Sequence, residues 1–256
     1  SGCGNLTGAI PSDLFAGIDG EYRDSMYHST FSGCAKLGTE ISESDIPQYM
    51  RDGYAIPPNL FGKLYNAPKG SMFHNTFSGC KGLQGRIPEK LFGEINGAPA
   101  GSMFAYTFYS CSGLRGEIPA DLFGGIKLTG ETQGNMFGQT FQGCAGLDSE
   151  IPPYLFGVLW GTPKSGMFSG TFTGCSGLKG EIPSDLFGDI SGNLPVNGYV
   201  FHGMFRGCYN LTGSSAKING QYLYDIWPNA TVSQVGVMYQ GATKLSDYAE
   251  IPAVWK

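Results

Sequence analysis

Residues 72–92 of the chain read MFHNTFSGCKGLQGRIPEKLF, and residues 167–187 read MFSGTFTGCSGLKGEIPSDLF. The two stretches keep the same order of aromatic, cysteine, glycine, proline and leucine residues, and the rest of the chain contains further copies. Self-similarity at a fixed period of roughly 20–50 residues is typical of repeat proteins, in which each unit packs only against its neighbours. The fold therefore depends on the structure of one unit and on the way consecutive units stack.

The cysteines mark the period of the repeat. They are Cys3, Cys34, Cys80, Cys111, Cys144, Cys175 and Cys208, separated by 31, 46, 31, 33, 31 and 33 residues. The one long spacing contains an insertion at about residues 42–55. Past the last cysteine, residues 239–245 read YQGATKL and match the FSGCKGL of the quoted unit, with Ala242 in the cysteine position. We therefore predict one domain, with 31–33-residue units over residues 1–213 and a degenerate C-terminal repeat, a candidate cap, over residues 214–256.

The composition is that of a folded chain with many turns. Of 256 residues, 41 are glycine, 41% are hydrophobic and only 14% are charged, and the formal net charge is -5. The charge is scattered and forms no basic stripe, which argues against nucleic-acid binding. No apolar run is long enough for a membrane span. The opening SGCGNLTG lacks the features of a signal peptide and matches the inside of a unit, so we expect a window from a longer array.

Each unit is expected to contain a helix of about ten residues. In the quoted unit, Met72, Phe73, Thr76, Phe77 and Cys80 fall at i, i+1, i+4, i+5 and i+8, which corresponds to one face of a helix. The residue before the methionine is Ser, Asn or Gly in five units, and these types suit a helix N-cap. Two residues after the cysteine comes Gly or Asn in six of the seven units, and these types suit a helix end.

A short strand is expected directly after this helix. The pattern Leu-x-Gly-x-Ile, as in residues 83–87, alternates and is followed by proline, which predicts a strand with Leu and Ile inward and two positions outward. A Leu-Phe-Gly-x-Ile segment, such as residues 186–190, then returns apolar side chains to the interior. Stacked units of this kind predict an α/β fold: a right-handed solenoid with one short strand and one short helix per unit and a parallel sheet on one face.

The repeated cysteine is expected in the core. Its place on the inner face of each helix puts all seven cysteines in one ladder along the stack, where a buried free cysteine behaves as a small hydrophobe. Ala242 fits the same small slot. Other roles fit less well, because disulfides need pairs and the count is odd, zinc needs clustered ligands and no CxxC occurs, and a nucleophile needs a histidine partner.

Several stretches resemble a known family of repeats. TFSGCKGL at residues 76–83, TFQGCAGL at 140–147 and MFRGCYNL at 204–211 are similar to the core of BspA-like leucine-rich repeats, found in bacterial surface proteins and some parasitic protists. LTGAIPSDLF at residues 6–15 resembles the strand half of plant-type leucine-rich repeats. The resemblance covers most of residues 1–213, although the units are longer than is typical of the BspA-like class. It implies a leucine-rich-repeat solenoid that acts as a non-enzymatic, cell-surface or secreted (extracellular) adhesion module.

Candidate binding residues lie where the units differ. On the two outward positions of the predicted strand they are Gln84, Arg86, Arg115, Glu117, Glu150, Lys179 and Glu181. In the loops expected after the return segment they are Tyr65 and Trp160, which suit contacts with a protein or a sugar. We expect Glu117, Glu150 and Glu181 about 5 Å apart on adjacent strands, a ladder that fits a basic partner or calcium. The alternatives are a solvated face with weak ion pairs and aromatic rings packed over neighbouring loops. The insertion is a candidate recognition loop or a tolerated change of length.

Other functions are weighed against adhesion to a protein or glycan on another cell or in the matrix. No asymmetric set of residues suggests catalysis, so we expect no enzyme and no cofactor, with calcium as the one ion considered. The nearest enzyme alternative is a polysaccharide-active parallel β-helix, which would lack a helix in each unit. His28 and His74 occupy equivalent positions, but two histidines without a nearby cysteine or carboxylate argue against a metal site. A structural protein whose open repeat ends self-associate head to tail into fibres or a coat is a further alternative.

Overall fold

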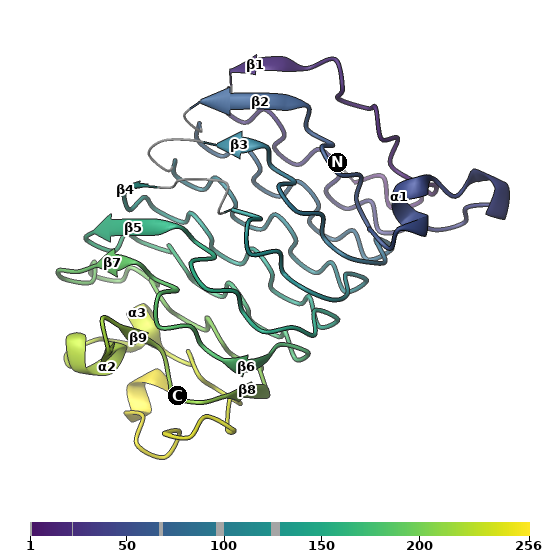
Figure 1. Cartoon of the computed structure of the whole chain (residues 1–256). Coiled ribbons are helices and arrows are strands. Elements are labelled where there is room, and N and C mark those ends of the chain that lie inside the picture. Colours follow the sequence, from purple (N-terminus) through teal and green to yellow (C-terminus); the bar gives the residue numbers. More distant parts are fainter. Residues whose placement is uncertain (1, 22, 67–68, 96–99, 124–128) are drawn as a thin grey trace.

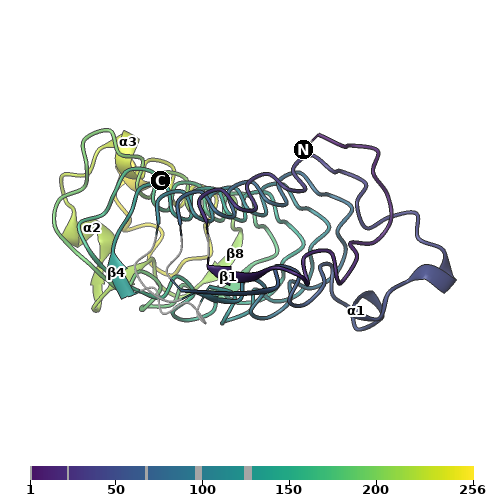
Figure 2. The same cartoon turned by 90° about the horizontal axis from the view of Figure 1, so that it is seen from above.

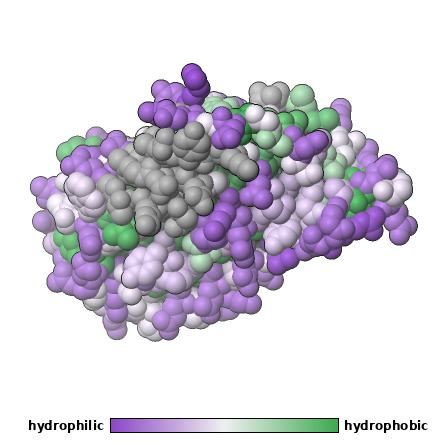
Figure 3. All heavy atoms as spheres, turned by 45° about the horizontal axis from the view of Figure 1, so that its top comes forward, coloured by the Kyte–Doolittle hydropathy of each residue, from purple (hydrophilic) through white to green (hydrophobic). Residues whose placement is uncertain are grey.

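Successive units form the coils of a stack. The computed structural model describes residues 2–21, 23–66, 69–95, 100–123 and 129–256, with the backbone alone at residues 63–66, 94–95 and 129–130. Figure 1 shows the coils following one another from the N-terminal to the C-terminal end, and Figure 2 shows them overlying one another. Among the coloured residues of the face in Figure 3, hydrophilic ones predominate and hydrophobic ones form separate areas. In the part of the chain that the structure describes, no helix is long and apolar enough to cross a membrane.

The strands are short, and most of them pair in parallel between coils. They are β1 (Asp19–Glu21), β2 (Lys63–Asn66), β3 (Glu94–Ile95), β4 (Thr129–Glu131), β5 (Val158–Gly161), β6 (Lys179–Glu181), β7 (Asp189–Ile190), β8 (Asn210–Thr212), β9 (Lys217–Ile218) and β10 (Gln221–Tyr222). The sheets have the orders β1-β2-β3, β4-β5-β7 and β6-β8, and β9 and β10 form an antiparallel pair. The helices are single turns: η1 (Glu43–Asp45), α1 (Gln48–Arg51), α2 (Leu223–Ile226), α3 (Val232–Val235) and η2 (Ala253–Trp255).

Strands occur at two positions of the coil rather than one. The predicted Leu-x-Gly-x-Ile position holds β6 and β8, and single parallel bridges join Gly85 to Leu114 and Gly116 to Leu147. The return segment, expected to run into loops, continues into β1, β2, β3, β5 and β7 (Figure 1). The prediction of a single short strand per unit is therefore wrong, because the chain also stays extended after Leu-Phe-Gly-x-Ile and pairs there with the next coil.

The helix predicted in each unit is also wrong: the cysteine-containing segments that the structure describes form no helix. Residues 71–80 form consecutive turns instead, and we call these and the equivalent segments of the other coils the turn ladder. Every second N–H bonds to the carbonyl three residues earlier, as Thr76 N does to Phe73 O at 3.2 Å. The alternate N–H groups bond to the next coil, as Phe77 N does to Thr107 O at 2.9 Å. Each coil thus donates half of these N–H groups to its neighbour instead of closing a helix.

The period of the burial pattern explains the difference. Over residues 72–80, two buried residues alternate with two half-buried ones, which is a period of four. An α-helix turns about 100° per residue, so positions eight residues apart would differ by about 80° around it. The turn ladder keeps them on one side, because Ser71, Asn75 and Gly79 have φ angles of 53°, 57° and 77° and redirect the chain every four residues. A non-glycine residue in this conformation costs about 1–2 kcal/mol, which the hydrogen bonds between coils help to offset.

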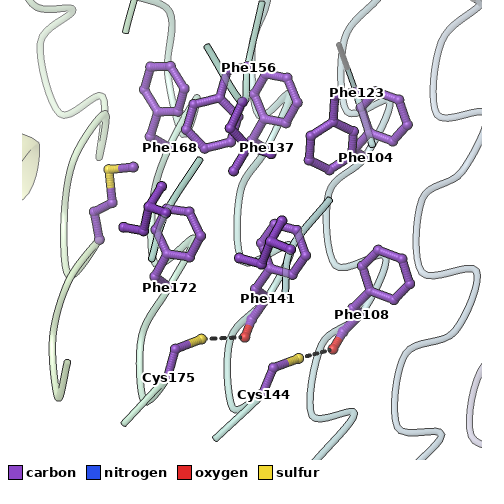
Figure 4. Close-up of a cluster of buried hydrophobic side chains, with 14 of the residues drawn as sticks. Phe104, Phe108, Phe123, Phe137, Phe141, Cys144, Phe156, Phe168, Phe172 and Cys175 are labelled. Atoms are coloured by element: carbon purple, nitrogen blue, oxygen red, sulfur yellow. Dashed lines mark hydrogen bonds between the residues drawn. The ribbon is translucent and has the colours of Figure 1, made fainter. Parts of the chain in front are cut away.

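Columns of stacked side chains form the core. Phe77 and Phe108 stack with their ring centroids 5.7 Å apart, and Phe73 and Phe104 stack at the same distance. Phenylalanines of the Leu-Phe-Gly segments pack against these columns, as Figure 4 shows for Phe123, whose ring centroid is 4.5 Å from that of Phe104. Aromatic pairs of this kind contribute about 0.5–1.5 kcal/mol each beyond the burial of their surface. These aromatic contacts recur in successive coils and fix the position of the backbone that carries the outward side chains.

The C-terminal segment covers the last coil. Trp227 and Trp255 are buried, and Tyr239 N donates to Trp255 O at 3.0 Å, a bond that the earlier coils make to the coil that follows them. Asp247 accepts hydrogen bonds from Ser215 N at 2.8 Å and from Ser215 Oγ at 2.6 Å. Residues 251–256 thus take the place beside the coil of Tyr239 that a following coil takes elsewhere in the stack.

Candidate functional site

A groove runs across the outer face of the Leu-x-Gly-x-Ile strands, and we call it the strand groove. It consists of three adjoining hollows of about 350, 580 and 770 Å³. The first two share Glu117, and the last two share Glu150, so the hollows continue from coil to coil. The predicted binding residues in its lining are Arg86, Glu117, Glu150, Lys179 and Glu181. Gln84 and Arg115 are exposed on the same strand segments, outside this lining.

The strand pairing is staggered by two residues per coil. The third residue of one Leu-x-Gly-x-Ile segment pairs with the first residue of the next, as in Gly85 with Leu114 and Gly116 with Leu147. The pairing of β6 with β8 keeps this stagger, because Gly180 pairs with Leu211. Equivalent residues of neighbouring coils therefore do not lie opposite one another.

The stagger overturns the predicted ladder of adjacent glutamates. The residue opposite Glu150 is Lys179, whose backbone N–H donates to Ser149 O at 3.0 Å in the same stagger. The residue opposite Glu117 is Asp148, one position after the pairing of Gly116 with Leu147. In the strand groove, Glu150 thus lies opposite a positive charge, on Lys179, whereas Glu117 lies opposite a second negative charge, on Asp148.

Arg86 joins the strand groove to the insertion. Its guanidinium carbon lies 4.7 Å from the centre of the Tyr54 ring, and its Nη2 donates to Asp52 O at 2.8 Å. Tyr54 and Arg86 also form a parallel backbone bridge, so the insertion forms one end of the groove. Arg115 is held within its own coil, because its Nη1 donates to Ser112 O at 2.6 Å.

Two glutamates of the groove lie across glycines of the next coil. A Cβ on Gly180 would lie 2.7 Å from Glu150 Cγ, and a Cβ on Gly213 would lie 2.6 Å from Glu181 Cγ. The glycines leave room for these side chains to extend along the stack, and their φ angles of 76° and 68° also favour glycine. Neither glutamate forms an ion pair with another residue that the structure describes, so both carboxylates remain available to a partner.

Trp160 lies in a strand and not in a loop. It belongs to β5, and its side chain is 47% exposed, whereas Leu159 beside it is buried. Glu131 of β4 and Asp189 of β7 pair with it on either side, and both are exposed. The ring is therefore displayed on a sheet instead of being packed under neighbouring loops. Tyr65 lies in β2, and its side chain is outside the part that the structure describes.

The buried cysteines hydrogen-bond to the preceding coil. Cys144 Sγ donates to Phe108 O, and Cys175 Sγ to Phe141 O, both at 3.0 Å (Figure 4). The same bond is made by Cys80, Cys111 and Cys208. Burial raises the pKa of the Cys80 thiol to about 12, so the group stays a protonated donor and a poor nucleophile. The repeated thiol is thus a hydrogen-bond donor as well as the small apolar group that we predicted.

Cys3 differs from the other six cysteines. It is exposed, whereas Cys34 and the cysteines that follow are buried. Its assignment to the buried core ladder is therefore not met in this structure. Ala242 is fully buried at the equivalent position of the last coil.

His28 and His74 stack face to face instead of converging on one point. Their ring centroids are 4.8 Å apart and their planes differ by 11°. Burial and, to a smaller extent, the nearby His28 lower the pKa of His74. Asn75 Nδ2 lies 3.0 Å from His74 Nδ1. Among the residues described here, no group of three or more His, Cys, Asp or Glu side chains is placed to hold a metal ion.

Comparisons of the chain with protein-family models, with curated proteins and with solved structures found no match. Function must therefore be inferred from the surfaces of the molecule itself. Two surfaces carry exposed side chains on backbone that is hydrogen-bonded between coils: the strand groove and the sheet that carries Trp160. Both are rigid platforms on which the side chains differ from coil to coil.

Proposed function

We propose that the chain is a leucine-rich-repeat solenoid of the BspA-like type and serves as a non-enzymatic binding scaffold, secreted or at a cell surface. One observation carries the proposal: core side chains repeat from coil to coil, whereas the side chains of the strand groove change. Phe77 and Phe108 are equivalent and stack, but the outward positions of the same two coils hold Arg86 and Glu117. A constant frame with variable outer residues suits recognition, because the frame fixes positions and the side chains set specificity.

The partner we propose is a protein or glycan on another cell or in the matrix. The strand groove presents Arg86 and Lys179 among a larger number of carboxylates, including Glu117, Asp148 and Glu150. A surface of mixed charge with an excess of basic groups would complement it. Calcium is the alternative source of positive charge, so partner binding has to be measured in its presence and absence.

A binding screen of the intact protein tests the proposal. The protein is applied to arrays of matrix proteins and glycans, with calcium and with a chelator. Each hit is then measured with the double variant Glu117→Gln and Glu150→Gln, which lie in the groove. The control is Glu43→Gln with Glu250→Gln, which changes the net charge equally at exposed positions outside the groove.

We expect the groove variant to lose at least about tenfold in affinity (about 1.4 kcal/mol) and the control to bind like the wild type. If the partners bind the groove variant with the same affinity as the wild type, the strand groove is not the binding surface. The absence of any hit in both conditions would count against a binding scaffold as a whole.

A polysaccharide-active enzyme is the second candidate, and the low helix content favours it. The described helices are single turns, and a coil without a helix is what we expect of a parallel β-helix. Glu117 and Asp148 face each other on adjacent strands, at a strand spacing of about 5 Å. Release of new chain ends from a panel of acidic and neutral polysaccharides, abolished by Glu117→Gln, would support this candidate. No release after prolonged incubation at micromolar protein would favour the scaffold.

A further inference from the structure

A row of three exposed residues crosses the sheet formed by β4, β5 and β7. Glu131 pairs with Trp160, and Trp160 pairs with Asp189, so the three residues lie side by side on neighbouring parallel strands. Adjacent strands are about 4.8 Å apart, which places a carboxylate on each side of the indole. We call these three residues the acid–aromatic row.

The row has a rigid base. Trp160 O accepts a hydrogen bond from Thr132 N at 3.1 Å, and Gly161 O accepts one from Ser191 N at 3.0 Å. Leu159 points into the core and is fully buried, so strand alternation directs Trp160 outward. The indole is therefore presented without a loop that has to become ordered on binding.

The charge of the row is open to a partner. Glu131 forms no ion pair and no side-chain hydrogen bond with the residues that the structure describes. Asp189 Oδ1 accepts one bond, from Asn219 Nδ2 at 3.3 Å. Lys217, on the hairpin that carries Asn219, has its ammonium 4.4 Å from the centre of the Tyr222 ring. Among the residues that the structure describes, neither carboxylate beside the exposed indole has a cationic partner.

We propose that the acid–aromatic row is a docking surface for a basic segment of a partner protein, with an Arg or Lys side chain placed over Trp160 and between Glu131 and Asp189. This inference rests on the proposed function only in treating the chain as a binding scaffold, and the surface is separate from the strand groove. A cation uses all three residues, because the ring face attracts it and both carboxylates neutralise it. A neutral sugar would stack on the ring but would leave both negative charges unpaired.

The test uses a labelled peptide that carries arginines separated by Ser or Thr residues. Trp160 is the exposed tryptophan, since Trp227 is 7% and Trp255 is 1% exposed, so acrylamide quenching of the intact protein reports on the row. We expect the peptide to protect Trp160 from quenching and the same peptide with Gln for Arg to give no protection.

Variants separate a specific site from general acidity. By fluorescence anisotropy, Glu131→Gln with Asp189→Asn and, separately, Trp160→Ala should each weaken peptide binding about tenfold, while Trp160→Phe should keep most of it. Equal binding by the carboxamide pair and by the control Glu43→Gln with Glu250→Gln would overturn the inference. So would protection of Trp160 by a neutral oligosaccharide and not by the peptide, which would assign the row to glycans. The variants Glu117→Gln and Glu150→Gln should leave peptide binding unchanged, so failure of the strand groove and failure of this row are distinguishable.

Discussion

Replacement of Gly174 by alanine distinguishes the turn ladder from a helix by the sign of the effect. Gly174 lies in the turn ladder one residue before Cys175, and its φ angle is 73°. A Cβ built on it would meet nothing closer than 3.8 Å, so the change adds no clash. The left-handed conformation costs alanine about 1–2 kcal/mol. Alanine also reduces the conformational freedom of the unfolded chain, which stabilises the folded state by about 0.4–1 kcal/mol. The expected net decrease in the free energy of unfolding is therefore about 1 kcal/mol. In a helix interior the same substitution would stabilise by about 1 kcal/mol.

Urea unfolding at 25 °C, followed by tryptophan fluorescence and by circular dichroism, measures the difference. The control is Gly17→Ala, because a Cβ there meets no atom within 4 Å and Gly17 is not among the residues with positive φ. We expect the control to change the unfolding free energy by less than about 1 kcal/mol, in the stabilising direction. A Gly174→Ala protein that is more stable than the wild type would refute the turn ladder and restore the helix. The wild-type spectrum should also lack a strong helical signal.

Three further predictions concern the core. Only Cys3 should react with a thiol reagent within minutes in the folded protein, because the other six cysteines are buried, and Cys3→Ser should abolish this fast phase. Thr140→Val should cost about 1–2 kcal/mol in urea unfolding, because it removes a buried hydroxyl whose oxygen lies 2.9 Å from both Phe104 O and Phe137 O and whose one hydrogen it shares between them, whereas the exposed Thr243→Val should have little effect. Stability should be greatest between about pH 6.5 and pH 9. Below 6.5 the unfolded chain protonates His74 and His202 more readily than the folded chain, because burial lowers their pKa values in the fold. From about pH 9 to 12 the unfolded chain ionises cysteines whose pKa burial raises to about 12 in the fold, such as Cys80 and Cys208, so stability falls there too. A urea midpoint that is higher at pH 5.5 or pH 10.5 than at pH 7.5 would contradict this.

The residues that face inward could be predicted from the sequence, because the repeat fixes them. Phe73, Phe77 and Cys80 are fully buried, as their recurrence in each unit indicated. The backbone that presents them could not be predicted from burial alone, because a helix and a chain of four-residue turns bury nearly the same positions over eight residues. The distinguishing signal is the recurrence of Ser, Asn or Gly at every fourth position, as at Ser71, Asn75 and Gly79. Other coils use Tyr106 and Gln139 at such positions, which makes the signal weak in any single unit.

The neighbours of each outward residue could not be predicted, because they depend on the stagger between strands. The sequence indicated that Glu117 and Glu150 face outward, and both are exposed. Their partners across the strand pairing follow from a shift of two residues per coil, and that shift is set by which backbone groups pair. The sequence places Trp160 at a variable position but predicts a loop there, because a strand after Leu-Phe-Gly has only one inward residue, Leu159, to mark its alternation.

The turn ladder and the strands of each coil differ in how they contact neighbouring coils, and this difference favours the strand surfaces for recognition. On the turn ladder, the outward side chains are half-buried and contact a neighbouring coil, as when Gln139 Nε2 donates to the hydroxyl of Tyr106 in the preceding coil at 2.8 Å. A change there alters the contact between coils as well as the surface. Glu117 and Trp160 stand instead on strands whose coil-to-coil bonds are made by the backbone, so their side chains can change without loss of those bonds. The side chains of the strand groove and those of the sheet that carries Trp160 can therefore change independently of each other. A partner that binds to both surfaces would make two separate sets of contacts, and their contributions to affinity would multiply.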